Sequence, residues 1–320
     1  MRKRVLVTGG AGYIGSHTCK ALASSGYEPV ALDNLSTGYR HNVKWGPLEV
    51  ADIADSELVR RIIRQYQPVS VIHFAGSAYV GESMVNPSKY YKNNTVATFL
   101  FIEVLVQEMI EVVVFSSTCA TYGIPKYLPL DTSHPQNPIS PYGFSKFVCE
   151  RMIIDFSRVY GQKYGLLRYF NAAGADEEGD LKEEHSPETH LIPLAIANAF
   201  GAGPKLKIFG NDYPTFDGTC VRDYIHVSAL SEAHVRTMER LIRGETKSEI
   251  RNLGSGRGFS IMEILSSIHR VTGRKVDVEF AGRRNGDPPE LWAKSDKEFS
   301  ATIDDNHLDR IISSVSFHYL

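Results

Sequence analysis

The chain has 320 residues, of which 42% are hydrophobic and 22% are charged, and its formal net charge is −2. This length suits one large domain or a large and a small one, and the composition is ordinary for a globular protein. The near-zero charge gives no electrostatic reason to expect nucleic acid or an anionic membrane as a partner. No apolar run reaches the roughly 18 residues that a membrane-spanning helix needs.

The N-terminal residues, cysteines and histidines point to an intracellular protein without metal. Arg2-Lys3-Arg4 runs directly into a short β-branched segment, so we expect no signal peptide. The four cysteines show no C-x-x-C pairing, which argues against a zinc site or a disulfide framework. The histidines lack ligand-like spacing, so we expect no metal site, and His307 is expected to face solvent. We predict a reduced, cytoplasmic protein.

The first 33 residues carry a dinucleotide-binding pattern. Residues 5–8 predict a buried strand, 16–25 a helix closed by Gly26, and 29–32 a second strand that ends on Asp33. The glycines between strand and helix fit both G-x-G-x-x-G and G-x-x-G-x-x-G, through Gly9, Gly10, Gly12 and Gly15. Glycines permit a tight turn and close backbone approach to a pyrophosphate at the helix N-terminus. Asp33 would accept hydrogen bonds from the adenosine ribose hydroxyls.

Strands alternate with helices through the first half of the chain. Further strands are predicted at 48–50, 69–74, 112–116 and 166–169, and helices at 56–65, 87–108 and 142–160. This alternation predicts an α/β protein with a doubly wound parallel sheet and right-handed crossovers. We expect a Rossmann domain that binds the dinucleotide over residues 1–171. A smaller substrate lobe is expected over residues 172–320, with segments that interleave with the first domain.

The second half has a less regular pattern. Helices are predicted at 191–201, 228–243 and 261–272, and strands at 222–227, 250–253 and 276–280. Residues 209–218 are predicted to form a loop.

Residues able to do acid–base chemistry follow the strand at 112–116. Thr118 lies just beyond it, and the next helix opens with Tyr142, four positions before Lys146. Residues at this spacing share one helical face. A tyrosine pKa near ~10 is too high for a base at neutral pH, and a nearby ammonium and a cationic nicotinamide would lower it. Thr118 would then hydrogen-bond the substrate oxygen whose proton Tyr142 takes.

Several motifs resemble those of the extended short-chain dehydrogenase/reductases. They are T-G-G-A-G-Y-I-G-S-H at 8–17, D-N at 33–34, V-G-E-S at 80–83, Thr118, and Y-x-x-x-K at 142–146. Three more motifs narrow the resemblance to the UDP-glucose 4-epimerases: R-Y-F-N-A-A-G at 168–174, F-G-N-D-Y-P at 209–214, and V-R-D-Y-I-H at 221–226. Segments 117–123 and 217–220 are similar to bacterial polysaccharide-associated epimerases and plant UDP-arabinose 4-epimerases. The resemblance runs from residue 2 to about residue 294.

The resemblance implies an isomerase with tightly held NAD, a UDP-sugar substrate and a transient 4-keto sugar. It implies catalytic roles for Tyr142, Lys146 and Thr118. The residues assigned to the cofactor are Gly9, Gly12, Tyr13, Ile14, Gly15, Asp33, Asn34, Asp52, Ile53, Phe74, Ala75, Gly76, Asn93, Ser116, Tyr142, Lys146 and Tyr169. The residues assigned to the UDP-sugar are Thr118, Tyr142, Asn171, His190, Leu191, Phe209, Arg222, Arg284, Asp287 and Leu291.

The resemblance also bears on substrate breadth and assembly. His190 stands where the family usually has asparagine, and Leu291 stands where members that reject N-acetylated sugars have tyrosine. UDP-N-acetylhexosamines are therefore expected as additional substrates. The family pairs the helices equivalent to 90–108 and 142–160 into a four-helix bundle, which implies a homodimer.

Three alternatives remain at this point. A UDP-arabinose or UDP-xylose 4-epimerase would share these motifs. A sugar-nucleotide dehydratase needs an acid and a base after Thr118, but Cys119 and Ala120 follow it here. A non-catalytic NAD-sensing module would not need Tyr142 and Lys146.

Overall fold

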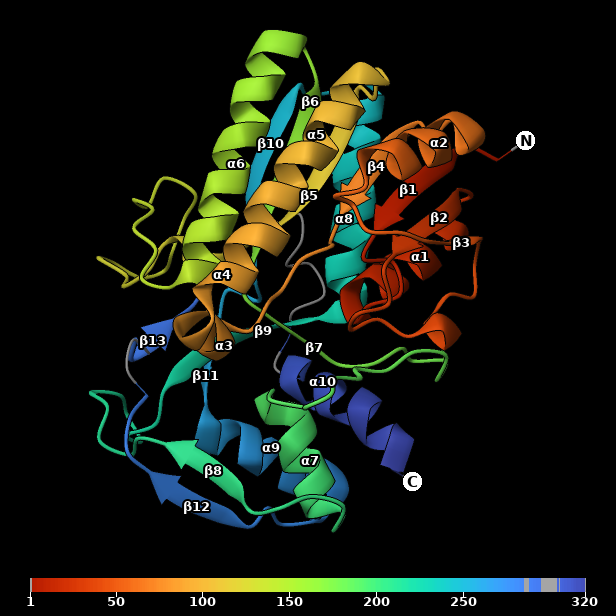
Figure 1. Cartoon of the computed structure of the whole chain (residues 1–320). Helices are drawn as coiled ribbons and strands as arrows, with labels where there is room; N and C mark the ends of the chain where they lie inside the picture. The colour runs from red at the N-terminus through yellow and green to blue at the C-terminus, as the bar shows by residue number, and fades with distance from the viewer. Residues whose placement is uncertain (1, 285–287, 295–303, 305, 320) are drawn as a thin grey trace. The chain divides into compact units, whose positions relative to one another are not determined.

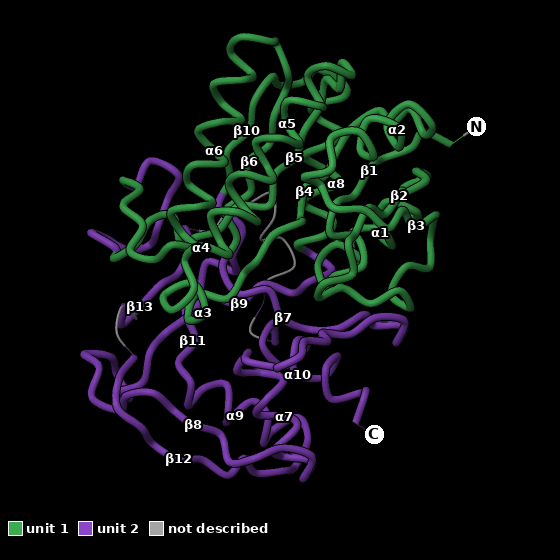
Figure 2. The backbone as a smooth tube through the Cα atoms, in the orientation of Figure 1, with its two compact units in different colours: residues 1–124, 135–169, 230–251 green, residues 125–134, 170–229, 252–320 purple. Residues whose placement is uncertain are grey.

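The computed structural model describes residues 2–284, 288–294, 304 and 306–319. The chain divides into two compact units (Figure 2). Unit 1 comprises residues 1–124, 135–169 and 230–251, and unit 2 comprises residues 125–134, 170–229 and 252–320. Each unit is therefore built from segments that lie far apart in the sequence. Among the described residues, no helix combines the length and the apolar character needed to cross a membrane.

Unit 1 is built around a seven-stranded sheet in the order β10-β6-β5-β4-β1-β2-β3 (Figure 1). Its strands are β1 (Arg4–Thr8), β2 (Glu28–Asp33), β3 (Leu48–Val50), β4 (Ser70–His73), β5 (Val112–Thr118), β6 (Lys163–Tyr169) and β10 (Ser248–Leu253). All neighbouring pairs from β3 to β6 are parallel. When these six strands are numbered along the chain, they lie across the sheet in the order 3-2-1-4-5-6. This is the strand order of dinucleotide-binding sheets.

Helices cover both faces of this sheet. They are α1 (Tyr13–Ser24), α2 (Ser56–Tyr66), α3 (Val80–Val85), α4 (Pro87–Tyr90), α5 (Ala97–Gln107), α6 (Pro141–Tyr160) and α8 (Val227–Ile242), with short turns η1 (Arg40–Asn42), η2 (Tyr91–Val96) and η3 (Cys119–Thr121). Leu166 packs with residues of α6, whereas a Cβ on Gly165 would meet Thr237 of α8. Because adjacent strand residues point to opposite faces, α6 and α8 cover opposite faces. Figure 1 shows α5 and α6 side by side.

In its described residues, unit 2 combines small sheets with three helices. Strand β9 (Val221–His226) pairs with β7 (Asn171–Ala173), β11 (Gly258–Ser260) and β13 (Glu290–Leu291), and β8 (Leu206–Phe209) pairs in parallel with β12 (Val278–Ala281). The helices are α7 (Leu191–Ala199), α9 (Ile261–Thr272) and α10 (His307–Ser316), followed by the turn η4 (Phe317–Tyr319). The three helices share one apolar core, which includes Ile196, Ile268 and Ile312.

The doubly wound parallel sheet is confirmed, and most predicted elements lie within a few residues of their expected bounds. Helix α1 begins at Tyr13, three residues earlier than expected, so Gly15 lies inside it. Strand β8 was not predicted, and its last residue lies in the segment expected to be a loop. The prediction for His307 is wrong. This side chain is buried, and its Nε2 atom lies 2.8 Å from the Tyr224 carbonyl oxygen.

Candidate active site

The glycine-rich turn brings the N-terminus of α1 against the ends of β1 and β4. Gly9 has φ +70°, and a Cβ there would lie 2.8 Å from the Ala75 nitrogen. A Cβ on Gly15 would lie 2.1 Å from the Gly9 carbonyl oxygen, so only glycine allows the helix to approach this closely. Gly12 is the N-cap residue of α1, and neither a capping side chain nor an acidic residue occupies the first turn. The positive end of the helix dipole therefore remains available for a phosphate group.

Asp33 lies at the end of β2, beside this turn. Its Oδ2 accepts a hydrogen bond from the Ala11 amide at 3.0 Å, and its Oδ1 accepts one from the Leu35 amide at 2.8 Å. Burial raises the pKa of this carboxyl, and the two amides partly offset that effect. A carboxylate has about four acceptor positions, so two remain for ribose hydroxyls. The glycine cradle and this acceptor fit a dinucleotide such as NAD.

The next predicted cofactor residues also lie at strand ends of unit 1. Asn34 donates to Asp52 Oδ2 at 2.9 Å, which links the segments after β2 and β3, and Ile53 is buried beside them. Phe74, directly after β4, packs on His234 of α8 with ring centroids 4.7 Å apart. These residues therefore line the same edge of the sheet as Asp33.

Two asparagines on the π-helical turn η2 hold the loop after β4. Asn94, which is buried, accepts from the Ser77 amide at 2.7 Å and donates to Ser145 of α6 at 3.0 Å. Asn93 donates to Ser77 Oγ at 2.9 Å. Gly76 adjoins this contact, since a Cβ there would lie 3.1 Å from Asn94 Oδ1. Asn93 is a predicted cofactor residue and Asn94 is not, although a pair of polar residues in an apolar helix is a visible signal for both.

Helix α6 brings Tyr142 and Lys146 to the end of β5. The helix begins after Ser140, whose hydroxyl accepts from the Gly143 amide at 3.1 Å, and it has proline in its first turn. Lys146 Nζ donates to the Ser116 carbonyl at 2.8 Å and lies 4.8 Å from the Phe115 ring centroid. The Thr118 side chain hydrogen-bonds Tyr142. The three predicted catalytic residues therefore lie together.

Burial dominates the electrostatics of these residues. It raises the pKa of the Tyr142 phenol well above its usual value, and the hydrogen bond with Thr118 acts in the opposite direction. Burial lowers the pKa of Lys146 to about 8. Tyr169 at the end of β6 hydrogen-bonds Ser116, and burial raises the pKa of Tyr169 to about 12. The sequence predicts a lowered pKa for the Tyr142 phenol. That lowering therefore requires a cation other than the residues of unit 1, such as the nicotinamide ring of the cofactor.

A buried ion pair that the sequence analysis missed supports α6. Glu150 on this helix accepts two hydrogen bonds from Arg168 of β6, at 2.9 and 2.7 Å. It also accepts from the hydroxyl of Ser117 and, at 2.9 Å, from Gln136. The pair joins α6 to β5 and β6, one helical turn beyond Lys146.

Unit 2 brings together several residues predicted to bind the UDP-sugar. Arg222 on β9 and Leu291 on β13 are paired neighbours in the parallel register. Asn171 on β7 donates to the Asp223 carbonyl of β9 at 2.8 Å. At the end of β8, the Phe209 ring lies under the guanidinium of Arg284, with Cζ 3.9 Å from the ring centroid.

The other predicted substrate residues of unit 2 have different surroundings. His190 is the N-cap residue of α7 and lies against Glu183 and Glu188 at 2.9 and 2.8 Å, and Leu191 is the first residue of that helix. Asp287 lies outside the described residues.

Asp223 was not assigned a role, yet it organises this region. Its buried carboxylate accepts from the backbone amides of Ser255, Gly256 and Ala293, at 2.6, 3.2 and 3.1 Å. Burial raises its pKa to about 6. Asp223 therefore ties the loop after β10 and the residue two positions after Leu291 to the strand that carries Arg222.

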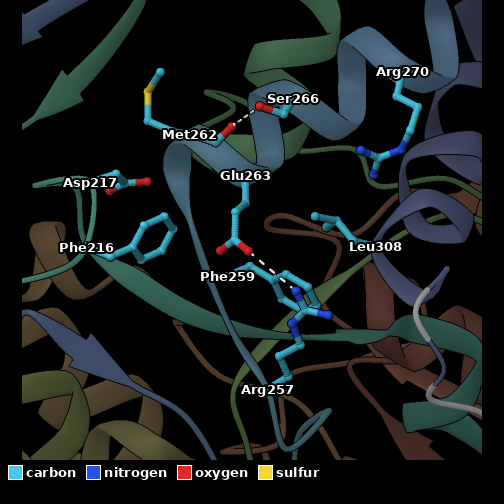
Figure 3. Close-up of a pocket in the computed structure, with 9 residues that line it drawn as sticks. All are labelled: Phe216, Asp217, Arg257, Phe259, Met262, Glu263, Ser266, Arg270 and Leu308. Atoms are coloured by element: carbon cyan, nitrogen blue, oxygen red, sulfur yellow. Dashed lines mark hydrogen bonds and ion pairs between the residues drawn. The ribbon is translucent and has the colours of Figure 1, made fainter.

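A cavity of about 310 Å³ lies in unit 2, and none of the predicted site residues lines it; Figure 3 shows its lining side chains. It is lined by Phe216, Asp217, Arg257, Phe259, Met262, Glu263, Ser266, Arg270 and Leu308. Its polar groups bind one another or neighbouring residues: Arg257 lies 3.5 Å from Glu263, and Ser266 donates to the Met262 carbonyl at 2.8 Å. This cavity gives no indication of a catalytic role.

Comparisons with known proteins agree with this geometry. A sequence model described as "NAD dependent epimerase/dehydratase family" matches residues 5–254. Over 293 residues the chain is 48% identical to a UDP-glucose 4-epimerase of Rhizobium meliloti (strain 1021), covering 92% of this chain and 89% of the relative. It is similar to the structure of UDP-glucose 4-epimerase from Brucella ovis in complex with NAD, with a TM-score of 0.94, 48% identity, and coverage of 99% and 98% of the two chains.

A further similar structure is the UDP-Glc/GlcNAc 4-epimerase from Campylobacter jejuni, with a TM-score of 0.83, 37% identity, and coverage of 99% of each chain. These findings confirm the resemblance that the motifs indicated. The chain belongs to the NAD dependent epimerase/dehydratase family.

Proposed function

We propose that this protein is an NAD-dependent UDP-glucose 4-epimerase. It interconverts UDP-glucose and UDP-galactose through a 4-keto sugar and so serves galactose metabolism. The observation that carries the proposal is the grouping of Thr118, Tyr142 and Lys146 at the end of β5, in the unit that also holds the glycine cradle and Asp33. The kinship with UDP-glucose 4-epimerases supports the same reaction.

The protein's own residues supply the acid–base chemistry. NAD held by the glycine cradle and Asp33 would supply the hydride acceptor and donor of the reaction. Tyr142 takes the proton of the sugar 4-hydroxyl group and gives it back, as a general base and then a general acid. Thr118 hydrogen-bonds the same oxygen and fixes its position. Lys146, held by the Ser116 carbonyl, places a cation on the helical face that carries Tyr142 and favours the phenolate.

The UDP-sugar is held by residues of unit 2. Arg222 and Arg284 are suited to the diphosphate because a guanidinium donates to phosphate oxygens as a bidentate fork. Phe209 packs beside the uridine, and Asn171, His190, Leu191 and Asp287 complete the set that the family resemblance implies.

The test of this proposal is turnover by the purified full-length protein. Incubation with UDP-glucose is expected to give UDP-galactose without added cofactor. A panel that includes UDP-xylose and UDP-arabinose separates this activity from a pentose-specific epimerase. A protein that holds a nicotinamide nucleotide but converts none of these sugars would contradict the proposal and favour a sensing module.

Localisation is part of the proposal. The four cysteines (Cys19, Cys119, Cys149 and Cys220) form no disulfide bond with one another, which is typical of proteins in a reducing compartment. We therefore infer a cytoplasmic location.

The nucleotide released on denaturation is expected to be NAD and not NADP. The Asp33 carboxylate would repel a 2′-phosphate, and no arginine directly follows it to offer compensation. Mass spectrometry of the released nucleotide checks this expectation. The variant Asp33→Asn keeps the shape but removes the charge, so its preference for NAD over NADP should weaken. Recovery of NADP from the wild-type protein would contradict the assignment.

A homodimer formed through α5 and α6 is a further part of the proposal. Phe101 and Leu105 are fully buried in unit 1, so they offer no surface for a partner. Phe99 and Phe144 are exposed, and Phe99 packs edge-on against Phe156 of α6 with centroids 6.2 Å apart. Phe99, Phe144 and Phe156 thus form an aromatic surface on α5 and α6. Such a surface suits pairing of these two helices with those of a second copy of the chain. Light scattering at micromolar concentration should give twice the chain mass; a monomer would refute the prediction.

The protein is expected to epimerise UDP-N-acetylglucosamine as well as UDP-glucose. Leu291 is the register neighbour of Arg222, and it is smaller than the tyrosine of sugar-selective relatives. A small change in pocket volume is worth about 1–3 kcal/mol, so Leu291→Tyr should shift the activity ratio roughly 10-fold or more toward UDP-glucose. Assays of wild type and variant on both substrates check this. An unchanged ratio would show that Leu291 does not control acceptance of the N-acetyl group.

A further inference from the structure

A group of two histidines and two glutamates lies just before α7, apart from the residues assigned to acid–base chemistry, and one of its members, His190, is also among the residues assigned to the UDP-sugar. This His/Glu cluster consists of Glu183, His185, Glu188 and His190. One potential ligand atom from each residue lies within 4.8 Å of the corresponding atoms of the other three. The spacing of the histidines in the sequence predicts no metal site. The local chain folds so that residues within an eight-residue segment face one another.

Two of the four distances within the cluster match the spacing of ligand atoms around a metal ion, and the other two are hydrogen-bond distances. His185 Nδ1 lies 3.4 Å from Glu183 Oε1 and 3.3 Å from Glu188 Oε2. His190 Nδ1 lies 2.9 Å from Glu183 Oε1 and 2.8 Å from Glu188 Oε1. Zinc bonds of about 2.0–2.2 Å to histidine nitrogen and carboxylate oxygen place tetrahedral ligand atoms about 3.3–3.6 Å apart. Small outward movements of the side chains would therefore open space for one ion.

The chemistry of the donors also suits a transition metal. Imidazole nitrogen with carboxylate oxygen is a ligand set for zinc and similar divalent ions, whereas calcium and magnesium prefer oxygen alone. The Glu183 side chain is only 3% exposed, and a buried carboxylate needs a cationic partner. One divalent ion with two neutral imidazoles would balance the two carboxylates.

We propose that the His/Glu cluster binds one divalent transition-metal ion of the zinc class. The ion would fix the segment 183–190, which has no helix or strand of its own, to the first turn of α7. It would thereby set the position of His190, the N-cap residue of that helix. This inference does not depend on the proposed epimerase activity, because the binding of the ion is measured directly.

The competing state of the cluster is an ion-pair network without metal. Burial opposes protonation of both histidines, but hydrogen bonds with Glu183 and Glu188 raise the pKa of His185 to about 9 and that of His190 to about 10. Two imidazolium groups would then balance the carboxylates in place of an ion. Ligand protons must leave before a metal binds, so the two states exclude each other. Metal content separates them.

The experiment uses the full-length protein without a histidine tag, stripped with a chelator and dialysed against Zn²⁺. Elemental analysis is expected to give one zinc per chain, and Co²⁺ in its place should give the visible absorption of a tetrahedral site. His185→Gln should weaken Zn²⁺ binding by roughly 100-fold or more, beyond the 10–100-fold effect of losing an outer-shell partner. Glu188→Gln should act in the same direction, and it replaces His185→Gln if that variant fails to fold.

The matched control is His269→Gln, which removes an exposed histidine of α9 in the same unit. It should retain zinc with wild-type affinity. Circular dichroism of each variant reports whether the fold is kept. The proposal is overturned if the wild-type protein takes up no zinc, or if folded His185→Gln and Glu188→Gln bind zinc as tightly as wild type. Because no assay here uses a UDP-sugar, its outcome is separate from that of the proposed function.

Discussion

Replacing Tyr142 by phenylalanine is expected to lower the epimerisation rate by about 10²–10⁴-fold, the usual contribution of a general acid–base catalyst. The substitution removes only the phenol oxygen, and the ring keeps its edge-on contact with Tyr90 at 6.2 Å. The helix should therefore stay intact. Lys146 cannot replace the lost base, because its ammonium donates to the Ser116 carbonyl.

The effect should appear in kcat while the bound nucleotide is retained. Turnover of UDP-glucose and the nucleotide content of the purified variant measure the two quantities separately. The matched control is Tyr160→Phe, which removes the same atom from an exposed tyrosine at the far end of α6 and should leave the rate unchanged. Turnover close to that of wild type in Tyr142→Phe would refute the mechanism. Loss of NAD together with activity would instead assign Tyr142 to cofactor binding.

The fold of unit 1 was predictable because its signals are local. In unit 1 the strand at 48–50 was predicted to the residue and α6 to within one residue, and in unit 2 the helix at 261–272 was also predicted to the residue. In α6 a serine cap, a proline in the first turn and Gly161 in a left-handed conformation mark both ends. The alternation of strands and helices then predicts a parallel sheet without any knowledge of tertiary contacts.

Other features depend on contacts between segments that no local pattern contains. His307 looks like a surface residue in its polar surroundings, yet α10 packs into the unit 2 core and buries it. The sequence pattern does not distinguish the exposed face of α5 from its buried face, because this helix is apolar on nearly every side. The same holds for the face of α6 that lies beside it. The His/Glu cluster required the conformation of a segment without regular secondary structure.

The catalytic residues were predictable in type and spacing, but the residues that support them were not. Tyr142 and Lys146 are recognisable in the sequence because they lie four residues apart on one predicted helix. Glu150 and Arg168 lie 18 residues apart on a helix and a strand, and only the packed sheet brings them together. Each alone resembles an ordinary surface charge, so burial is the information that the sequence lacks.

Breaking the Glu150–Arg168 ion pair is expected to lower the free energy of unfolding substantially. The Arg168 and Glu150 side chains are 5% and 1% exposed. Hydrogen bonds with Glu150 raise the pKa of Arg168, although burial opposes this, so the cation stays charged. Glu150→Leu would leave that guanidinium buried, with the Tyr122 hydroxyl at 3.0 Å as its remaining side-chain hydrogen-bond partner among the residues that the structure describes. Removing one member of a buried pair lowers the free energy of unfolding by about 3–5 kcal/mol.

Urea unfolding of the wild type and three variants separates charge from shape. Glu150→Leu should be the least stable variant. Arg168→Met should be destabilised as well, because it leaves the Glu150 carboxylate buried without its cationic partner. The double variant should recover much of the loss, because two apolar side chains of similar volume can replace a buried pair at little net cost. If Glu150→Leu stays within about 1 kcal/mol of wild type, the pair is screened as a surface pair would be. If the double variant is no more stable than Glu150→Leu, the loss comes from packing around α6 and not from the unpaired charge.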